Sequence, residues 1–243
     1  IYCGVQRNKP KTKNNVLNAV KELIKLGKFR NNGEITFQGG EPTILSEFEN
    51  LLKLFLKQGS KVRIHSSGIL FSRAIREGLK KGTVSVVISP DSASEEMYKT
   101  VKRVDKSKDV WCNIKHYRRN LKAGFQNLVK VKYIIIPGVN DNLIEIDEFL
   151  NKLKKIDIKS LIVDIEYTYA NTNIDNISEH VYMLMDYMEN FALKNNMEYD
   201  LYDSAKYAEQ NRKFEKVTNF DPDDFSREFN KIQWENLKQN INY

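Results

Sequence analysis

"EITFQGGEPTIL", residues 34–45, is a short apolar strand that runs directly into two glycines, a carboxylate and a proline. Gly39 and Gly40 lack a Cβ, so the backbone there can lie against a bound molecule, while Glu41 supplies charge and Pro42 restricts the exit. The alternative interpretation is a plain strand-to-helix turn, because short motifs are weak evidence by themselves. The segment predicts a ligand-binding strand end, and its neighbours decide between the two.

Segments typical of strands and of helices alternate along the chain. Strands separated by helices of ten or more residues pair in parallel through right-handed crossovers. The sequence therefore predicts an α/β fold, either a barrel or an open doubly wound sheet. The strand candidates are residues 34–37, 61–66, 84–89, 129–136, 160–165 and 197–202, and the helix candidates are residues 15–26, 46–58, 110–122, 142–155 and 178–194.

Two of these helices show a clear apolar face. In the helix at 46–58, Ser46 and Glu49 have the spacing of a capping box, and Gly59 ends the helix. The helix at 15–26 is expected to turn its apolar face inward. The inward residues are Leu45, Phe48, Leu51, Leu52, Phe55 and Leu56 for the first helix and Leu17, Val20, Leu23 and Ile24 for the second.

The residues that follow the strand candidates are polar or glycine-rich. Ligands bind at the carboxyl ends of parallel strands in barrels and in open sheets. These loops are therefore expected to converge on one rim and to form a site. They read QGGE (38–41), SSG (66–68), SPDS (89–92), PGVND (137–141) and EY (166–167).

The composition limits the class of protein. With 243 residues, of which 41% are hydrophobic, the chain can bury a sizeable core. No stretch approaches the roughly 20 apolar residues of a membrane span, and residues 1–13 are too polar for a signal peptide. Two distant cysteines, Cys3 and Cys112, do not form a disulfide framework, which agrees with a reducing compartment. We expect a cytoplasmic protein that is not bound to a membrane.

The net charge of +7 leaves an anionic partner such as nucleic acid open. The basic residues are spread along the chain without glycine or aromatic residues between them, so a lysine-rich composition is the simpler explanation.

Four segments together resemble the radical S-adenosylmethionine (radical SAM) enzymes: "IYC", "TFQGGEPTIL", "SPDSASEEMYKTV" and "VKYIIIPGVND". The resemblance covers roughly residues 1–170. It implies a partial barrel of six βα units, a (βα)6 TIM-like barrel of parallel strands, with the first strand upstream of Ile1. Residues 1–202 would form this core, and residues 203–243 a polar, helical C-terminal extension.

The resemblance also implies an iron–sulfur cofactor. The family places three cysteines spaced C-x-x-x-C-x-x-C after the first strand, the last preceded by an aromatic residue, and Tyr2-Cys3 matches that ending. The residue before Ile1 would then be a cysteine, with another four positions earlier. A 4Fe–4S cluster normally takes four cysteine ligands, so three leave one iron free for S-adenosylmethionine. An electron from the cluster would cleave that cofactor to a 5'-deoxyadenosyl radical, which abstracts a substrate hydrogen.

The resemblance assigns roles to individual residues. Gly39, Gly40 and Glu41 match the motif that accepts the methionine ammonium. Ser89 and Asp91 match positions that contact ribose hydroxyls, although a Ser-Pro-Asp turn explains them equally well.

Three further positions follow from the same resemblance. Tyr2 would lie against adenine, and Lys132 could approach the cofactor's carboxylate or ribose, unless it points outward into solvent. Ile135 and Ile136 are better explained as core residues. Residues 66–68 depart from the Thr-Asn-Gly turn of relatives, so their role in binding stays open.

The remaining candidates are weaker. Cys112 and His116, four apart on one helix face, form at most half a metal site. His65 and His180 have no triad pattern around them. Glu166, Tyr167 and Tyr169 follow the last barrel strand, where a substrate would enter. The tail has no cysteines for auxiliary clusters.

The reaction stays open within this family. A glycyl-radical-enzyme activase, a modifier of peptides, sugars or RNA, and a small-molecule synthase all use the same hydrogen abstraction. An electron donor such as flavodoxin or ferredoxin and an unidentified substrate would be the partners. Outside the family, the alternatives are a phosphate- or nucleotide-binding enzyme, for which the usual glycine motifs are missing, and a non-catalytic basic module that binds RNA or an acidic protein.

Overall fold

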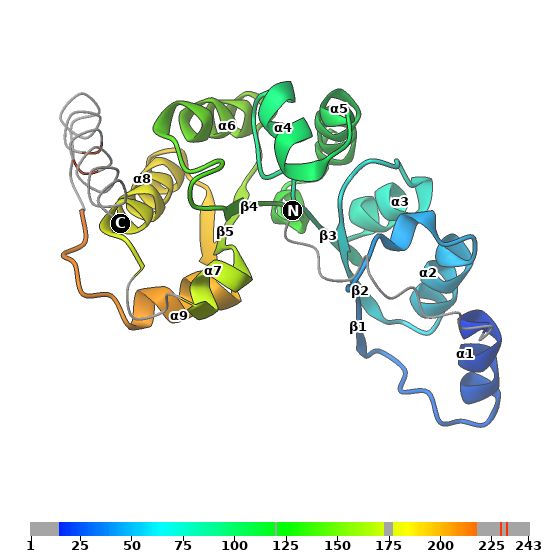
Figure 1. Ribbon diagram of the computed structural model, residues 1–243. Coiled ribbons are helices and arrows are strands. Elements are labelled where there is room, and N and C mark those ends of the chain that lie inside the picture. Colours follow the sequence, from blue (N-terminus) through cyan, green and yellow to red (C-terminus); the bar gives the residue numbers. More distant parts are fainter. Residues whose placement is uncertain (1–14, 120, 173–176, 218–228, 230–231, 233–243) are drawn as a thin grey trace. The chain divides into compact units, whose positions relative to one another are not determined.

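The computed structural model describes residues 15–119, 121–172, 177–217, 229 and 232 (Figure 1). Six parallel strands form one sheet in the order β1-β2-β3-β4-β5-β6. A doubly wound sheet reverses its strand order at a switch point, whereas a barrel adds strands consecutively. The consecutive order therefore confirms the barrel-type α/β prediction. The strands are β1 (Glu34–Phe37), β2 (Lys61–Ser66), β3 (Val84–Ile88), β4 (Val129–Ile135), β5 (Ser160–Ile165) and β6 (Glu198–Leu201).

Helices connect the strands, as the crossovers of a parallel sheet require. The α-helices are α1 (Val16–Lys25), α2 (Phe48–Lys57), α3 (Arg73–Lys81), α4 (Glu95–Lys102), α5 (Ser107–Arg118), α6 (Leu143–Ile156), α7 (Tyr167–Thr172), α8 (Glu179–Lys194) and α9 (Asp203–Gln210). Two short 3-10 helices, η2 (Pro42–Ile44) and η3 (Gln126–Leu128), precede α2 and β4. Among the described residues, no helix is both long and apolar enough to span a membrane.

The described residues divide into two compact units. Unit 1 comprises residues 15–90 and 106–131, and unit 2 comprises residues 91–105 and the described residues from 132 onward. The predicted boundary between residues 202 and 203 stays a prediction.

Unit 1 is a parallel sheet covered by helices. β1 pairs with β2 from Glu34 opposite Lys61, and α2 and α3 contact β2 and β3 (Figure 1). The face of α2 predicted to be apolar enters the core, where the ring of Phe48 lies 5.3 Å from that of Phe37. The buried residues of α2 are Phe48, Leu51, Leu52 and Phe55.

Unit 2 has its core between β4, β5 and the helices α6 and α8. Tyr133 on β4 packs edge-on against Phe149 on α6, with 4.7 Å between ring centroids, and both rings are fully buried. α6 contacts α8, α8 contacts β6, and α9 contacts β5 and α7 (Figure 1). The six-residue β5 is buried along its whole length, as expected for a strand covered on both faces.

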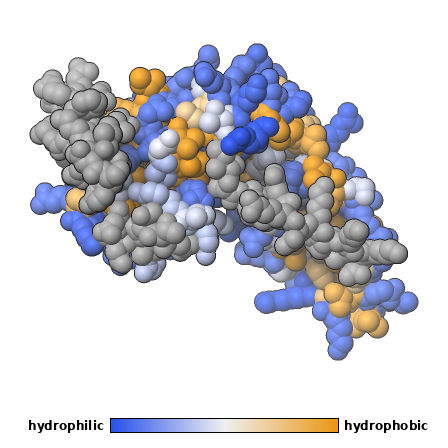
Figure 2. All heavy atoms as spheres, in the orientation of Figure 1, coloured by the Kyte–Doolittle hydropathy of each residue, from blue (hydrophilic) through white to orange (hydrophobic). Residues whose placement is uncertain are grey.

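Two predictions about helix details were wrong. Glu47, not Ser46, is the N-cap of α2 and makes no side-chain cap hydrogen bond; Glu49 instead accepts a hydrogen bond from Ser72 Oγ at 2.9 Å. α1 lies within the predicted range 15–26, with Asn15 and Leu26 as its caps, but none of its residues is buried, and Leu23 is 45% exposed. Figure 2 shows hydrophobic side chains on the surface around α1 and the loop that follows it.

A hydrogen bond from Tyr133 is expected to stabilise the Pro-Gly loop after β4. The buried Tyr133 hydroxyl donates a hydrogen bond of 2.7 Å to the backbone carbonyl of Asn140. Tyr133→Phe leaves that buried carbonyl without its partner, so we expect a loss of about 1–3 kcal/mol in the free energy of unfolding, measured with urea. Tyr207→Phe, at a tyrosine that is 48% exposed, is the matched control and should change the value by less than about 0.5 kcal/mol. Equal effects of the two substitutions would contradict the assignment.

Candidate functional site

The glycine pair after β1 leaves its backbone open. Gly39 has a φ of +88°, which favours glycine, and a Cβ added at Gly39 or Gly40 would meet no atom within 4 Å. Both residues are exposed, and neither makes a hydrogen bond to the rest of the described chain. Within the described part of the chain, the peptide groups of this glycine pair are therefore without hydrogen-bond partners, and their role in binding a ligand stays a prediction.

Glu41, next in the chain, binds the loop after β1 to the end of β2. Its Oε1 accepts hydrogen bonds from the Thr43 amide (3.1 Å), Thr43 Oγ1 (2.5 Å) and Ser66 Oγ (2.9 Å). Its Oε2 accepts one from the Ser67 amide at 2.5 Å. The carboxylate thus fixes the position of the glycine pair, while Oε2 keeps lone-pair capacity for a further donor.

The Ser-Ser-Gly turn after β2 serves this carboxylate. Ser66 Oγ donates to Glu41 and accepts from the Gly68 amide at 3.0 Å, and a Cβ at Gly68 would collide with Ile88 Cγ2 at 2.6 Å. Asn113 on α5 donates to the Gly68 carbonyl at 2.9 Å. No local sequence pattern indicates Asn113, because Asn113 and Gly68 are 45 residues apart.

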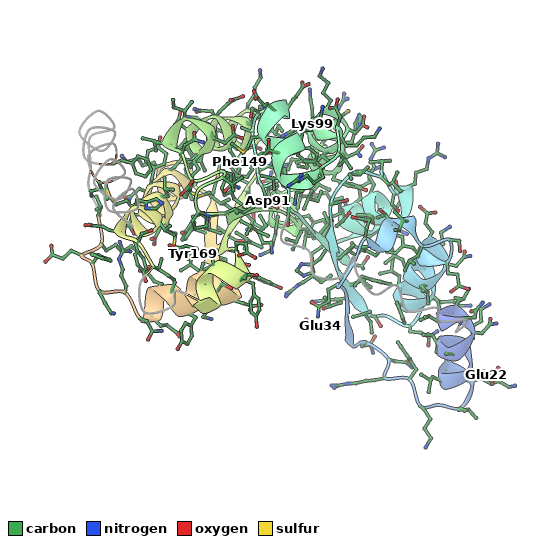
Figure 3. The ribbon with its side chains drawn as sticks, viewed as in Figure 1. Glu22, Glu34, Asp91, Lys99, Phe149 and Tyr169 are labelled. Carbon is green, nitrogen blue, oxygen red and sulfur yellow. The ribbon has the colours of Figure 1, made fainter. Side chains whose placement is uncertain are left out.

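The loop after β3 contains both predicted ribose contacts, Ser89 and Asp91, which differ in burial and in their hydrogen-bond partners. Ser89 is half-buried, and its hydroxyl has no partner among the described residues. Asp91, marked in Figure 3, has no exposed surface and a φ of +56°. Its Oδ1 accepts from the Ile134 amide at 2.9 Å, and its Oδ2 forms an ion pair with Lys102. A ribose at Asp91 would have to displace one of these partners, whereas Ser89 is free to bind.

Unit 2 also joins its strand-end loops through buried polar side chains. Asn140, fully buried, donates to the carbonyls of Asp91 and Ile134, each at 2.9 Å, and accepts from the Ile136 amide at 2.7 Å. Glu145, in the first turn of α6, accepts from the amides of Ala93 and Ser94 and from Ser94 Oγ. These side chains hold the loops after β3 and β4 in one arrangement.

Lys132 on β4 points into the protein, so the outward-facing alternative was wrong. Its side chain is 13% exposed and its ammonium lies 3.6 Å from Asp164 Oδ2 and 5.0 Å from the ring centroid of Tyr202. Burial raises the pKa of Asp164, and the charge of Lys132 and two backbone N–H groups lower it in part.

His180 at the start of α8 pairs with Asp141, which the sequence did not reveal. His180 Nε2 lies 2.8 Å from Asp141 Oδ2, and both side chains are largely buried. The ring of His180 also packs edge-on against Phe229, at 6.4 Å between centroids. The partners are 39 residues apart, so no local pattern could have linked them.

The predicted substrate-entry residues remain predictions. Glu166 accepts from the Tyr169 amide at 2.7 Å and so caps α7, and Tyr169 OH lies 3.4 Å from Ser178 Oγ (Figure 3). Tyr167 is 72% exposed.

The cysteines give no metal site in the described part of the chain. Cys112 Sγ lies 3.6 Å from His116 Nδ1 on the exposed face of α5, as predicted, but no group of three or more ligands occurs among the described residues. Tyr2 and Cys3 lie outside the described residues. Ile135 and Ile136 are buried, which confirms their assignment to the core.

A family model described as the Radical SAM superfamily matches residues 1–153. Among sequence relatives, GTP 3',8-cyclase of Clostridium botulinum (strain Hall) is 28% identical over 170 residues, which are 68% of this chain and 51% of the cyclase. Molybdenum cofactor biosynthesis protein moc-5 of Caenorhabditis elegans is 28% identical over 160 residues, 63% of this chain and 25% of that protein. The chain spans about half the length of the C. botulinum cyclase.

Solved structures share the fold. Streptococcus suis SuiB bound to its precursor peptide SuiA superposes with a TM-score of 0.58 at 13% identity, over 83% of this chain and 46% of SuiB. A domain of pyruvate-formate lyase-activating enzyme from Bacteroides vulgatus gives a TM-score of 0.53 at 17% identity, over 70% of this chain and 99% of that domain. At these identities the likeness concerns the fold alone.

The hydrogen bonds of Glu41 generate a testable prediction. Glu41→Gln places an amide NH2 where backbone and hydroxyl donors now meet a carboxylate, so we expect a loss of about 1–3 kcal/mol in the free energy of unfolding, measured with urea. The matched control is Glu34→Gln, at the exposed start of β1, the strand before this loop (Figure 3), with an expected change below about 0.5 kcal/mol. A Glu41 variant as stable as the control would show that these contacts do not hold the loop.

Proposed function

The chain belongs to the Radical SAM superfamily, and from this membership we propose that it forms the barrel core of an enzyme that abstracts hydrogen from its substrate. Members of this family use a 4Fe–4S cluster and S-adenosylmethionine. When both are bound, their chemistry is reductive cleavage of S-adenosylmethionine to a 5'-deoxyadenosyl radical. The protein's part is to bind, orient and shield the reacting groups.

The open glycine pair beside a fixed carboxylate supports this proposal most strongly. An ammonium carries only donors, so it needs acceptors. The exposed, unbonded peptide groups of Gly39 and Gly40 and the remaining capacity of Glu41 Oε2 supply such acceptors side by side. We assign the methionine ammonium of S-adenosylmethionine to this loop, and a ribose hydroxyl to Ser89.

Asp91 has a different part in this proposal. Because its buried carboxylate pairs with Lys102 and the Ile134 amide, it acts on ligand binding by fixing the loop that contains Ser89. Removing one partner of such a buried pair costs about 3–5 kcal/mol, so this loop resists rearrangement.

The cluster needs more thiolates than this chain has. Cys3 and Cys112 are its two cysteines, and Cys112 lies on the exposed face of α5. Cys3 alone matches the family's ligand spacing, so the residues present fit one ligand of the cluster and not the set.

GTP is the substrate to test first, because the sequence relatives at 28% identity carry the name GTP 3',8-cyclase. The likeness to the activating enzyme rests on the fold at 17% identity and does not favour the activase alternative. A small electron carrier such as a flavodoxin or ferredoxin would supply the electron. We place the protein in the cytoplasm, where thiols stay reduced.

The test is anaerobic reconstitution of the full-length protein with iron and sulfide. We expect thiolate-to-iron absorbance and, after reduction in the presence of S-adenosylmethionine, 5'-deoxyadenosine detected by chromatography. Cys3→Ala in the full-length protein, and the 243-residue chain by itself, should yield neither, because too few thiolates remain to hold the cluster.

Two results would contradict the proposal. One is a full-length protein that forms no cluster or releases no 5'-deoxyadenosine. The other is a Cys3→Ala variant that cleaves S-adenosylmethionine as well as the unmodified protein does.

A further inference from the structure

Lys132 lies on the face of β4 that turns away from α6. Residues of β4 alternate between buried and half-buried, and the buried Tyr133 packs on Phe149 of α6. Side chains of successive strand residues point to opposite faces of a sheet. Lys132 therefore extends from the other face of β4, where Asp164 of β5 and Tyr202 after β6 are its neighbours.

The ammonium of Lys132 has no hydrogen-bond acceptor in the described part of the chain. Its closest anionic atom is Asp164 Oδ2 at 3.6 Å, which is an ion pair but too long for a hydrogen bond. Tyr202 contributes the face of its ring, with the centroid 5.0 Å away. An ammonium has three donors, and the Lys132 nitrogen is not among the fully buried, unpartnered polar atoms of the described chain, so its donors can reach a ligand from solvent. With only 13% of the side chain exposed, this group is prepared to receive an acceptor from outside the chain.

Asp164 is held in a position where it attracts the Lys132 ammonium but does not accept a hydrogen bond from it. Asp164 Oδ1 accepts from the Ile165 amide at 3.0 Å and from the Ala205 amide, in the first turn of α9, at 3.3 Å. These contacts fix the carboxylate, and only Oδ2 faces the ammonium. The arrangement places a positive charge, with unused donors, on a rigid strand.

We propose that Lys132 is the receptor for an anionic oxygen group of the substrate, a carboxylate or a phosphate, and that Asp164 and Tyr202 are its positioning residues. The assignment of this anion to a substrate rests on the proposed function, whereas the anion receptor itself does not. Lys132 lies inside the segment that the family model matches, residues 1–153, whereas Asp164 and Tyr202, which position its ammonium, lie beyond that segment. Because the residues that shape this receptor are outside the matched segment, we assign the anion to the substrate, and the separate binding experiment with S-adenosylmethionine tests the cofactor instead.

The experiment uses the reconstituted full-length protein and anaerobic calorimetry with inorganic pyrophosphate, malonate and S-adenosylmethionine as separate probes. Lys132→Met is compared with Lys154→Met, the same change at an exposed position of α6. We expect the unmodified protein and Lys154→Met to bind at least one of the two anions equally well. Lys132→Met should bind it about 10- to 100-fold more weakly, as the loss of a hydrogen bond from a charged group implies. The affinity for S-adenosylmethionine should not change.

Asp164→Asn is expected to strengthen anion binding, the opposite of the effect of Lys132→Met. Asparagine keeps an acceptor for the two backbone amides but removes the charge that competes with the incoming anion. Burial already opposes that charge, so the variant should fold. We expect anion binding to tighten several-fold in Asp164→Asn, while a purely structural role would weaken it or leave it unchanged. Thermal unfolding of each variant identifies any that fail to fold.

Three outcomes would overturn the inference. They are an anion affinity of Lys132→Met equal to that of Lys154→Met, an equal loss of affinity for S-adenosylmethionine in Lys132→Met, and an unmodified protein that binds neither anion. None of these depends on turnover. A protein that binds the anions through Lys132 but releases no 5'-deoxyadenosine would contradict the proposed function. The inference that Lys132 is an anion receptor would still hold.

Discussion

The carboxylate of Glu41 is the contact on which the candidate cofactor site depends. It accepts hydrogen bonds from Thr43, from Ser66 Oγ and from the Ser67 amide, and so joins the loop after β1 to the end of β2. The glycine pair just before it makes no hydrogen bond to the described chain. Without a fixed neighbour, two exposed glycines would lose the most conformational freedom on binding a ligand. Because the hydrogen bonds of Glu41 already restrict the loop in the folded protein, less conformational freedom is lost when a ligand binds, and the open peptide groups are already in place.

Unit 2 uses the same device at its own strand ends. Asp91, Asn140 and Glu145 are buried side chains that accept from or donate to the backbone of neighbouring loops. In each case an acidic or amide side chain replaces the regular hydrogen bonds that a loop lacks. Lys132 differs from these side chains, because Asp164 lies near its ammonium at 3.6 Å without accepting a hydrogen bond from it. The loop side chains therefore hold the structure, whereas Lys132 keeps donors for a ligand.

The sequence predicted the strands and the long helices well, because period-2 runs of Val and Ile and period-3.6 apolar faces are local signals. β1, β2 and β5 have the predicted bounds. The helices α3, α4, α7 and α9 went unassigned individually, since they are short and largely polar. The hydrogen bonds between side chains and loops at the site could not be predicted from the sequence, because their partners are far apart along the chain. Glu41 and Ser67 are 26 residues apart, Ala93 and Glu145 are 52 apart, and only the fold brings them together. Ser46 and Glu49 have the spacing of a capping box, but Ser46 is not the N-cap of α2. Glu49 instead accepts a hydrogen bond from Ser72, so a tertiary contact replaces the local contact that the motif predicts.

We propose that the loop at Gly39–Glu41 receives S-adenosylmethionine, and a substitution at Gly40 tests this assignment without removing any contact of the described chain. A Cβ at Gly40 meets nothing within 4 Å, so Gly40→Ala should fold normally, and its methyl group should occupy only ligand space. Gly33→Ala, before the start of the same strand, adds a methyl in ordinary contact with Arg30. In the reconstituted full-length protein, we expect Gly40→Ala to bind S-adenosylmethionine about tenfold more weakly or worse, equivalent to about 1.4 kcal/mol, and Gly33→Ala to bind it as the unmodified protein does. Equal affinities in Gly40→Ala and the unmodified protein would contradict this assignment.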